Sequence, residues 1–440
     1  MDFLSPGKRL KALRQQLNIK QVELEEIGVS RNYISMVESD KRNLTGLTLA
    51  NYLKFMQNKA DELETNINLD VNYLLLPEKE EARNYCHMKL DSTLSHKNLE
   101  EVIKIGEKYK LEDILLKSYL LKGNLLYDEN SYNTAFIYYY KMLEIYNDNK
   151  DNSNKSFAYI KLSKCKIMTL SYEEALTYLF KAYSYCKEFN DDANLRNCLY
   201  NIALVYKKLG EYDNALIYID ELLNICNCDT NINLYISSII LKCNCYIRKK
   251  DYHLALTIYF DILNNFSENI GVHLGMIHNN IGYIYCELNE IDKSIDYFSR
   301  AINFRKLHDI EQLNRSIIDM SSVYIKDNLY DKAIELLYEG IALCEKYCDT
   351  EFLIIGYSIL EDIYIKLNDN NKLEEIYLIL IEIFKDIDLV KVLGIYIKLS
   401  LLYMDMGKYD KSKEILYEAN NVQKLFSYKV HIFLQSYKLL

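Results

Sequence analysis

The chain has 440 residues, of which 50% are apolar, and it carries a formal net charge of −10 at pH 7. That apolar content is ample for a buried core, so the composition excludes a disordered chain. The acidic balance also argues against a general binder of polyanions, because affinity for phosphates comes largely from Lys and Arg.

Prolines and charges are unevenly distributed along the chain. Only two prolines occur, Pro6 and Pro77, so helices can run through most of the length without the lost donor and the clash that proline brings. Residues 1–66 carry ten basic against nine acidic side chains, for +1, and residues 1–22 carry five against one, for +4. We therefore expect an almost wholly helical protein in which contact with nucleic acid is made by the amino end.

Eleven cysteines, an odd number, are spread through the expected helices, without a secretory leader or a membrane-spanning apolar run. This pattern predicts free thiols, a cytoplasmic location and no membrane contact. The pairs Cys226/Cys228 and Cys243/Cys245 lack the two-residue gap of a zinc knuckle, so no metal is expected.

The first helix is expected to start at Ser5 and Pro6. A hydroxyl cap is followed there by proline at the first helical position, where its missing N–H does no harm. Leu10, Leu13 and Leu17 then mark one buried face. The sequence therefore predicts a short amphipathic helix at the amino end.

A second segment is expected to begin near Lys20, with a tight turn at Gly28 and a third helix capped by Ser30. Ile34 and Val37 would face inward in that helix. Its outward face would hold Arg31, Asn32, Ser35 and Met36. A fourth helix, capped by Thr45 or Thr48, would bury Leu49, Tyr52, Leu53 and Met56. A short helix, a turn and a capped helix in this order are the layout of a helix-turn-helix.

The domain boundaries follow from a polar, acidic stretch over residues 60–72, which ends in an apolar run before Pro77. We expect a DNA-binding domain over residues 1–66, a linker and connecting helix over 67–84, and a repeat domain over 85–440. The first helix of the array should start after Pro77.

From there on, the chain returns every thirty-nine or forty residues to an aromatic or apolar residue followed, three positions later, by a small or apolar one. The pairs are Tyr132/Ala135, Tyr172/Ala175, Tyr212/Ala215, Tyr252/Ala255, Ile291/Ser294, Tyr330/Ala333, Asn370/Leu373 and Tyr409/Ser412. A fixed period of this size predicts stacked units that cover one another's apolar faces. In the clearest unit, Cys198 to Cys226, two helices face each other and Ala215 lets them approach closely.

Two known families resemble these regions. Residues Lys8 to Leu44 resemble the lambda-repressor-like DNA-binding domains through Leu13-Arg14, Lys20-Gln21, Leu24, Gly28-Val29-Ser30-Arg31, Ile34-Ser35, Glu38 and Lys41-Arg42-Asn43. The stretch Gln21 to Ser30 is one residue shorter than the commonest spacing in that family. The array resembles tetratricopeptide repeats. The expected fold is therefore all-α, a helix-turn-helix followed by a right-handed α-solenoid of about eight helix pairs.

The combination resembles the peptide-sensing RRNPP regulators of Gram-positive bacteria. That resemblance implies a cytoplasmic quorum-sensing transcription regulator, a homodimer that binds promoter DNA and takes a short signalling peptide on the concave face of its array. In the lambda-repressor-like family, residues at the positions of Arg14 and Glu38 form an internal ion pair, so both are expected to be structural. No cofactor is implied.

The DNA-binding set follows from the outward face of the third helix and its flanks. Arg suits guanine and Asn suits adenine in the major groove, and flanking polar groups suit phosphate. The set comprises Gln21, Ser30, Arg31, Asn32, Ser35, Lys41, Arg42 and Asn43. The competing interpretation is an ordinary solvated face.

The peptide-binding set takes first-helix residues that should face away from the second helix. Asn can donate to and accept from a peptide backbone, and Arg can hold a carboxylate. The set comprises Asn197, Tyr200, Asn244, Asn279, Tyr283, Arg315, Ser322, Ser358 and Asp362, whereas Asn201 and Asn280 are expected to be structural.

Two alternatives stay open. An array of this kind also suits a protein that binds a response regulator or kinase, as a phosphatase or inhibitor, or a plain interaction scaffold.

The seven histidines are dispersed, and neither a glycine-rich phosphate loop nor a Gly-x-Ser-x-Gly elbow occurs, so no enzymatic activity is expected.

Overall fold

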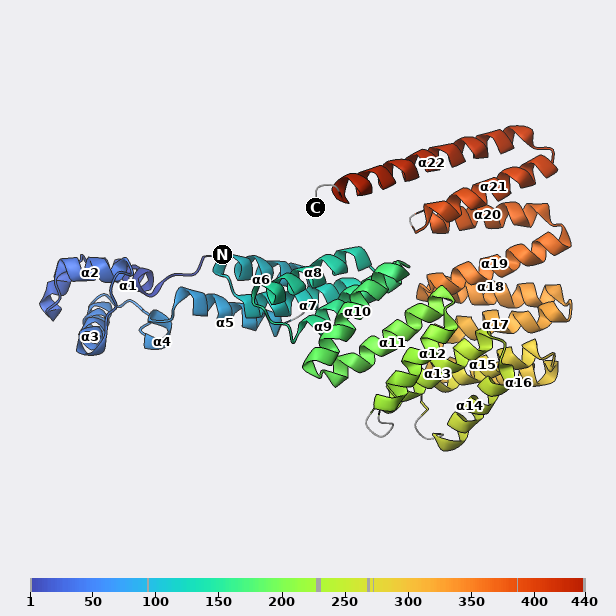
Figure 1. The fold of residues 1–440 in the computed structure, drawn as a ribbon. Coiled ribbons are helices and arrows are strands. Elements are labelled where there is room, and N and C mark those ends of the chain that lie inside the picture. Colours follow the sequence, from blue (N-terminus) through green and yellow to red (C-terminus); the bar gives the residue numbers. More distant parts are fainter. Residues whose placement is uncertain are drawn as a thin grey trace. The chain divides into compact units, whose positions relative to one another are not determined.

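A computed structural model describes residues 2–92, 95–226, 231–266, 270–271, 273–385 and 387–437, the last thirteen of them as backbone only. Within these ranges the secondary structure consists of helices and contains no strand, which confirms the all-α prediction. The chain forms two compact units, Met1–Gly210 and Glu211–Leu440, each taken by itself below. Figure 1 labels their helices in chain order.

The amino-terminal part of the first unit is a small helical domain. Its core centres on Leu24, Tyr52 and Met56, each 1% exposed or less. The domain consists of α1 (Pro6–Gln16), the 3-10 helix η1 (Glu23–Ile27), α2 (Arg31–Glu38), α3 (Gly46–Glu62) and α4 (Val71–Leu74). Leu74 belongs to the same core, so packing of this domain extends into the stretch before Pro77.

The second segment of this domain is a 3-10 helix rather than an α-helix. Gly28 ends it with a φ of 81° in the left-handed region, and its N–H donates to the Glu25 carbonyl at 3.0 Å. The stretch from Gln21 to Ser30 is short, and the tighter 3-10 spacing suits such short pieces. The left-handed turn at Gly28 itself is as expected.

Helix caps agree with the sequence at one start and differ at another. Ser30 caps α2 as predicted, because its hydroxyl accepts from the Tyr33 N–H at 3.3 Å. Ser5 is the N-cap residue of α1 and Pro6 is its first residue, as predicted, but the Ser5 hydroxyl makes no capping bond and donates to Asp40 instead. The Asp40 carboxylate also accepts from the Gly7 N–H at 2.8 Å, so a side chain from after α2 does the capping.

The array begins with α5 (Glu78–Leu90), directly after Pro77 as predicted, and α6 (His96–Tyr109). Phe3 is buried in the core of this helix pair, and its N–H donates to the Tyr109 hydroxyl at 3.2 Å. The amino-terminal residues are therefore part of the first array core as well as the entry to α1.

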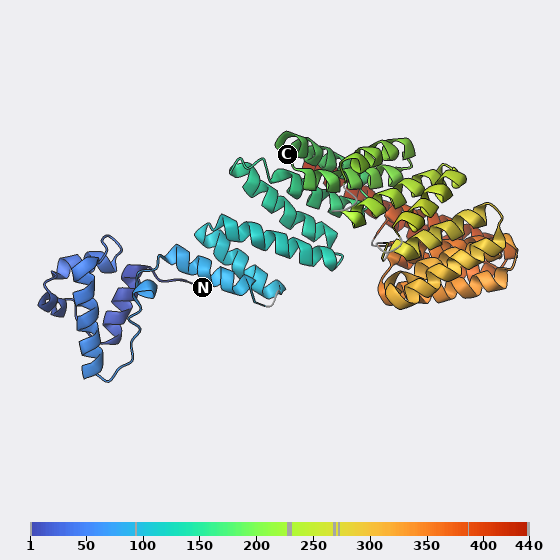
Figure 2. The ribbon, with the colours of Figure 1, turned by 90° about the horizontal axis from the view of Figure 1, so that it is seen from below.

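The remaining helices of the first unit are α7 (Glu112–Asp128), α8 (Tyr132–Asp148), α9 (Lys155–Met168), α10 (Tyr172–Phe189) and α11 (Asp192–Leu209). The second unit holds α12 (Tyr212–Ile225), α13 (Ile232–Arg248), α14 (Tyr252–Asn265), α15 (His273–Glu287), α16 (Ile291–His308), η2 (Ile310–Gln312), α17 (Leu313–Lys326), α18 (Tyr330–Tyr347), α19 (Thr350–Leu367), α20 (Asn370–Phe384), α21 (Leu389–Asp405) and α22 (Tyr409–Tyr437). Figure 2 shows from below how neighbouring helices within each unit pack along their lengths.

The forty-residue pattern marks the helix starts. The first member of each recurring pair, from Tyr132 to Tyr409, is the first residue of the second helix of its repeat. The small member is buried: Ala135, Ala175, Ala215, Ala255, Ser294 and Ala333 are each 0% exposed. In the repeats that lie within one unit, a small buried side chain at this point allows the two helices to approach closely, as the sequence predicted. The repeat from Cys198 to Cys226 crosses the boundary between the two units.

Candidate functional site

The outward face of α2 presents polar side chains to solvent. Arg31, Asn32 and Ser35 are exposed, whereas Ile34 and Val37 on the opposite face are 1% and 2% exposed. Ser30, at the start of the helix, is exposed too. The structure thus brings four of the predicted DNA-binding residues to one surface, which is the arrangement that reading a major groove requires.

A buried ion pair fixes the position of α2. Arg14 Nε and Nη2 contact the two carboxylate oxygens of Glu38 at 2.6 and 2.9 Å, which confirms the internal pair. The bond to Glu38 raises the pKa of Arg14 above its usual value. Gln21 joins the pair, since its amide donates to Glu38 at 2.8 Å. Gln21 is therefore half-buried in this network rather than free on the surface.

Lys41, Arg42 and Asn43 are exposed in the loop after α2. The Tyr33 hydroxyl donates to the Asn43 carbonyl at 3.0 Å, and the Arg42 guanidinium carbon lies 5.9 Å from the centre of the Tyr33 ring. The loop is thereby held against α2, and it extends the polar surface of that helix.

In the first unit, the first helices of successive repeats line a pocket with a volume of about 410 Å³. That volume lies within the usual range for ligand sites. Helix α7 contributes Asn124, Tyr127 and Asp128. Helix α8 contributes Tyr139, α9 contributes Lys161, Lys164, Ile167 and Met168, and α11 contributes Asn201 and Leu204. Two ammonium groups, two amides and two phenols therefore surround one cavity.

Three residues that line this pocket, Asn124, Tyr139 and Lys161, form a small polar cluster. Asn124 Oδ1 accepts from the Tyr139 hydroxyl at 2.8 Å and from Lys161 Nζ at 2.9 Å. The Lys161 ammonium also lies 5.7 Å from the centre of the Tyr139 ring and 5.5 Å from that of Phe157. Burial lowers the pKa of Lys161 from its usual value. The cluster fixes the ammonium in place without a bond to a carboxylate.

The pocket residues follow the forty-residue repeat. Asn124, Lys164 and Leu204 are forty positions apart and occupy the same place on α7, α9 and α11. In the second unit, the same place holds Asn244, Tyr283, Ser322 and Asp362, four residues of the predicted peptide-binding set. Counting back from Asn244 in steps of forty residues leads to Leu204, Lys164 and Asn124, which all line the pocket. The predicted peptide-binding set does not include Asn124, Lys161 or Lys164.

The predicted peptide-binding residues of the first unit lie outside the residues that line this pocket. Asn197 is exposed on α11, and its carbonyl accepts from the Asn201 amide at 2.8 Å. Tyr200 is half-buried, and burial raises its pKa. Asn201 is buried and bonded within α11, as expected of a structural residue, and it also lines the pocket.

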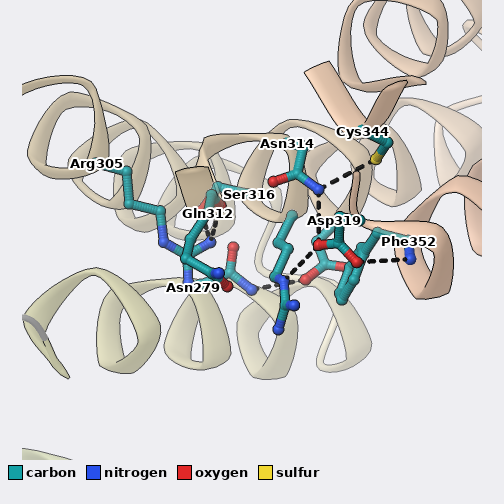
Figure 3. A network of polar contacts seen from close by, with 10 residues as sticks. Asn279, Arg305, Gln312, Asn314, Ser316, Asp319, Cys344 and Phe352 are labelled. Atoms are coloured by element: carbon teal, nitrogen blue, oxygen red, sulfur yellow. Dashed lines mark hydrogen bonds and ion pairs between the residues drawn. The ribbon is translucent and has the colours of Figure 1, made fainter. Parts of the chain in front are cut away.

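In the second unit, several predicted residues are engaged in internal bonds (Figure 3). The Asn279 amide donates to the Asp319 carboxylate at 2.7 Å, and Arg315 Nε donates to the Asp349 carboxylate at 2.9 Å. Asp349 also accepts from the Asn314 amide at 2.9 Å and from the backbone N–H of Phe352 at 3.2 Å. Asn279 and Arg315 therefore connect neighbouring repeats.

The other predicted residues of this unit fall into two groups. Asn244 accepts from the Asn280 amide at 3.0 Å, Ser322 donates to the Asp319 carbonyl at 2.6 Å, and Tyr283 is half-buried. Asn280 is thus structural as expected. Ser358 and Asp362 are exposed on α19. None of these five is among the residues that line the first-unit pocket.

The buried Arg305 completes the polar network of Figure 3. Its Nη1 donates to the Gln312 carbonyl at 3.0 Å and to the Ser316 hydroxyl at 2.7 Å. In the described part of the chain, Arg305 makes no ion pair, and burial lowers its pKa to about 10. The network joins neighbouring repeats, and it leaves Arg305 Nε, Asn279 Oδ1 and Asn314 Oδ1 buried without a hydrogen-bond partner among the described residues.

Three of the four paired cysteines lie among the described residues. Cys226, Cys243 and Cys245 are buried, while Cys228 lies outside the described residues. Burial raises the pKa of Cys243 far above that of a reactive thiol. Throughout the described ranges, no three potential metal ligands gather. None of the helices searched there combines the length and apolarity needed to cross a bilayer.

Comparisons with known families match both regions. A helix-turn-helix family model matches residues 10–63, and a tetratricopeptide repeat model matches residues 197–227, 277–306 and 393–424. The chain therefore carries a helix-turn-helix domain followed by tetratricopeptide repeats, as the sequence predicted.

Individual relatives are distant. Response regulator aspartate phosphatase J of Bacillus subtilis (strain 168) is 25% identical over 98 residues, which are 22% of this chain and only 26% of that protein. The apo form of the quorum sensor NprR from B. thuringiensis is 19% identical with a TM-score of 0.49, over 78% of this chain and 99% of that one. NprR in complex with its cognate peptide NprX is 19% identical with a TM-score of 0.45, over 67% and 88%.

Proposed function

We propose that this protein is a peptide-responsive transcription regulator of the RRNPP type. In this proposal it binds promoter DNA as a homodimer through α2 and binds a short peptide on its repeat array. The helix-turn-helix and the tetratricopeptide repeats supply the two binding functions. Occupancy of the array by peptide changes DNA affinity only if the peptide binds the DNA-competent and DNA-incompetent arrangements unequally.

The observation that carries the proposal is the exposed polar face of α2, which stands on the buried Arg14–Glu38 pair. Arg31, Asn32 and Ser35 lie on that face, inside the region that matches the helix-turn-helix family. A rigid base matters, because side chains that read base edges must be held in register with the groove. Two such heads are needed for half-sites one or more turns apart, hence the proposed dimer.

The first-unit pocket supports the proposal that the repeat array binds a peptide. Its lining combines aromatic walls with amide donors and acceptors, a mixture suited to an extended peptide. Most of its lining residues come from the first helices of the repeats, although none of the nine predicted peptide-binding residues is among them.

The proposal is tested by DNA binding of an Arg31→Ala variant. The probe is a duplex selected from random-sequence DNA by the wild-type protein, titrated in a gel-shift assay at fixed salt. Loss of a base contact should weaken binding about tenfold or more, since one good contact contributes on the order of 1–3 kcal/mol. Arg300→Ala, which removes an exposed arginine on α16, is the matched control and should bind like the wild type. Equal affinity of the Arg31 variant and the wild type would remove α2 from the proposal.

A second candidate is a protein that binds a response regulator. The observation in its favour is the sequence similarity to response regulator aspartate phosphatase J. Incubation with a panel of phosphorylated response regulators separates the two candidates. Faster loss of the phosphoryl group would favour this second function, whereas unchanged rates together with selection of a DNA duplex would favour the first.

A further inference from the structure

The pocket of the first unit contains cations that the protein itself leaves without an anionic partner. Neither Lys161 nor Lys164 has a carboxylate oxygen within ion-pair distance among the described residues, whereas Lys166 on the same helix pairs with Glu174 at 2.6 Å. Asp128 at the edge of the pocket is exposed and forms no ion pair with either lysine. The lining therefore has two positive groups and one negative group, which favours an anion inside it.

Asn124 adds an oriented donor to these cations. Its Oδ1 is identified by its neighbours, because the Lys161 ammonium can only donate and must therefore face an oxygen. The same oxygen accepts from Tyr139. The amide nitrogen of Asn124 makes no bond of its own in the described structure, so its two hydrogens are available to a ligand.

Asn201 on α11, two repeats after Asn124, supplies a hydrogen-bond acceptor. Its amide nitrogen donates to the Asn197 carbonyl at 2.8 Å, which leaves its Oδ1 as an acceptor. A peptide backbone presents N–H and C=O groups together, so one free amide donor and one free amide acceptor match it. An inorganic anion would use the donors alone.

This arrangement is local to the first unit. At the place that Lys164 occupies, the second-unit repeats carry Asn244, Tyr283, Ser322 and Asp362, none of which is a cation. At the place of Lys161, the last repeat carries Lys398, which bonds to Glu361 at 2.7 Å. The repeat pattern itself therefore does not require unpaired lysines, and their presence calls for a binding explanation.

We propose that this pocket binds a carboxylate of an extended peptide, held by the ammonium groups of Lys161 and Lys164 and by the amide of Asn124. The inference rests on the proposed function and names the chemistry that the array selects. The carboxylate can come from the peptide carboxy terminus or from an Asp or Glu side chain. Both sources present two oxygens to three donors, and charge-assisted bonds of this kind are the strong ones.

The test begins with a random hexapeptide library whose members end in a free carboxylate. Peptides retained by the full-length wild-type protein are sequenced and resynthesised in three forms: the free acid, the carboxy-terminal amide, and the free acid with Asp and Glu changed to Asn and Gln. Calorimetry should show a loss of affinity of about tenfold or more in the form that lacks the bound carboxylate. Whichever neutral form loses affinity identifies the source.

Two variants test whether the ammonium groups of Lys161 and Lys164 hold the carboxylate. Lys161→Met and Lys164→Met keep the length of the side chain and remove its charge. Each should bind the free acid about tenfold more weakly than the wild type and distinguish less between the acid and neutral forms. Lys181→Met, on the exposed side of α10, is the control and should behave like the wild type. Thermal melts establish that each variant is folded.

Retained peptides whose affinity is the same in all three forms would overturn the inference, as would full discrimination by Lys161→Met. Failure of the proposed function has a different signature. In that case the peptides bind with carboxylate dependence, yet they leave the affinity for the selected DNA duplex unchanged. A wild-type protein that retains no peptide at all would overturn both.

Discussion

The two units use the same repeat for different purposes. In the first, polar side chains on the first helices surround a pocket and keep unused donors and acceptors, as Asn124, Lys161 and Asn201 do. In the second, corresponding helices are joined by internal bonds such as Asn279–Asp319 and Arg315–Asp349 (Figure 3). The difference teaches that outward polar residues on equivalent helices can either bond to the neighbouring repeat or keep a hydrogen-bonding group open to a ligand.

The largest expected effect comes from breaking the second-unit network at its centre. Asp349→Ala removes the acceptor of Arg315, Asn314 and the Phe352 N–H together. Loss of a helix cap and of a mostly buried ion-pair partner should cost about 3 kcal/mol of unfolding free energy. Urea denaturation measures this. Asp362→Ala, an exposed carboxylate on the same helix, should change stability by less than about 0.5 kcal/mol. Equal effects of the two variants would mean that the network contributes no stability.

A smaller effect is expected from crowding the first-unit pocket. A Cβ at Gly123 would lie 2.6 Å from the Tyr139 ring, which supports Asn124. Gly123→Ala should therefore destabilise the protein by about 1–2 kcal/mol, net of the gain in helix propensity, and weaken binding of a library-selected peptide. The control is Gly394→Ala in α21, where a Cβ meets nothing within 4 Å and should stabilise by up to about 1 kcal/mol. A Gly123 variant as stable as the Gly394 variant would show that Tyr139 moves freely.

The smallest expected effect is a pH dependence of the unfolding free energy that comes from Asp319 in the second-unit network. Burial raises the pKa of Asp319 above its usual 3.8. The ionised carboxyl therefore destabilises the folded state at neutral pH, and this penalty disappears as the pH falls through the raised pKa toward 3.8. Asp319→Asn keeps an acceptor for Asn279 and should be more stable than the wild type at pH 7. The advantage should shrink at pH 4.

Urea denaturation of both proteins at the two pH values checks this, with the exposed Asp296→Asn as the matched control. A stability difference that grows as the pH falls would contradict the assigned direction of the Asp319 pKa shift. It would also mean that the bond from Asn279 outweighs the effect of burial.

The repeat organisation was predictable because its cause is local. A buried small or apolar residue three positions after the start of the second helix recurs from Ala135 to Ser412, and these helices begin where the pattern places them. The polar face of α2 was predictable for the same reason, since 3.6-residue periodicity separates Ile34 and Val37 from Arg31 and Asn32. Caps were less predictable, because Asp40 reaches α1 from another element.

The pocket was only partly predictable. The forty-residue register from Asn244 leads back to Lys164 and Asn124, so the positions were within reach of the sequence. Lys161 was not, because a lysine on a helix is most simply an exposed charge. The functional significance of Lys161 depends on the absence of a carboxylate partner for its ammonium group among the described residues.

By itself, the sequence determined the helix starts, the buried small positions and the outward faces, because these depend on spacing within one repeat. Only the tertiary structure decided which outward residues stay unpaired. The partners of Asn279 and Arg315 lie thirty-four to forty positions away, on the next repeat. A periodic pattern shows that such residues are neighbours in space, but the bond between them depends on side-chain geometry that no single repeat specifies.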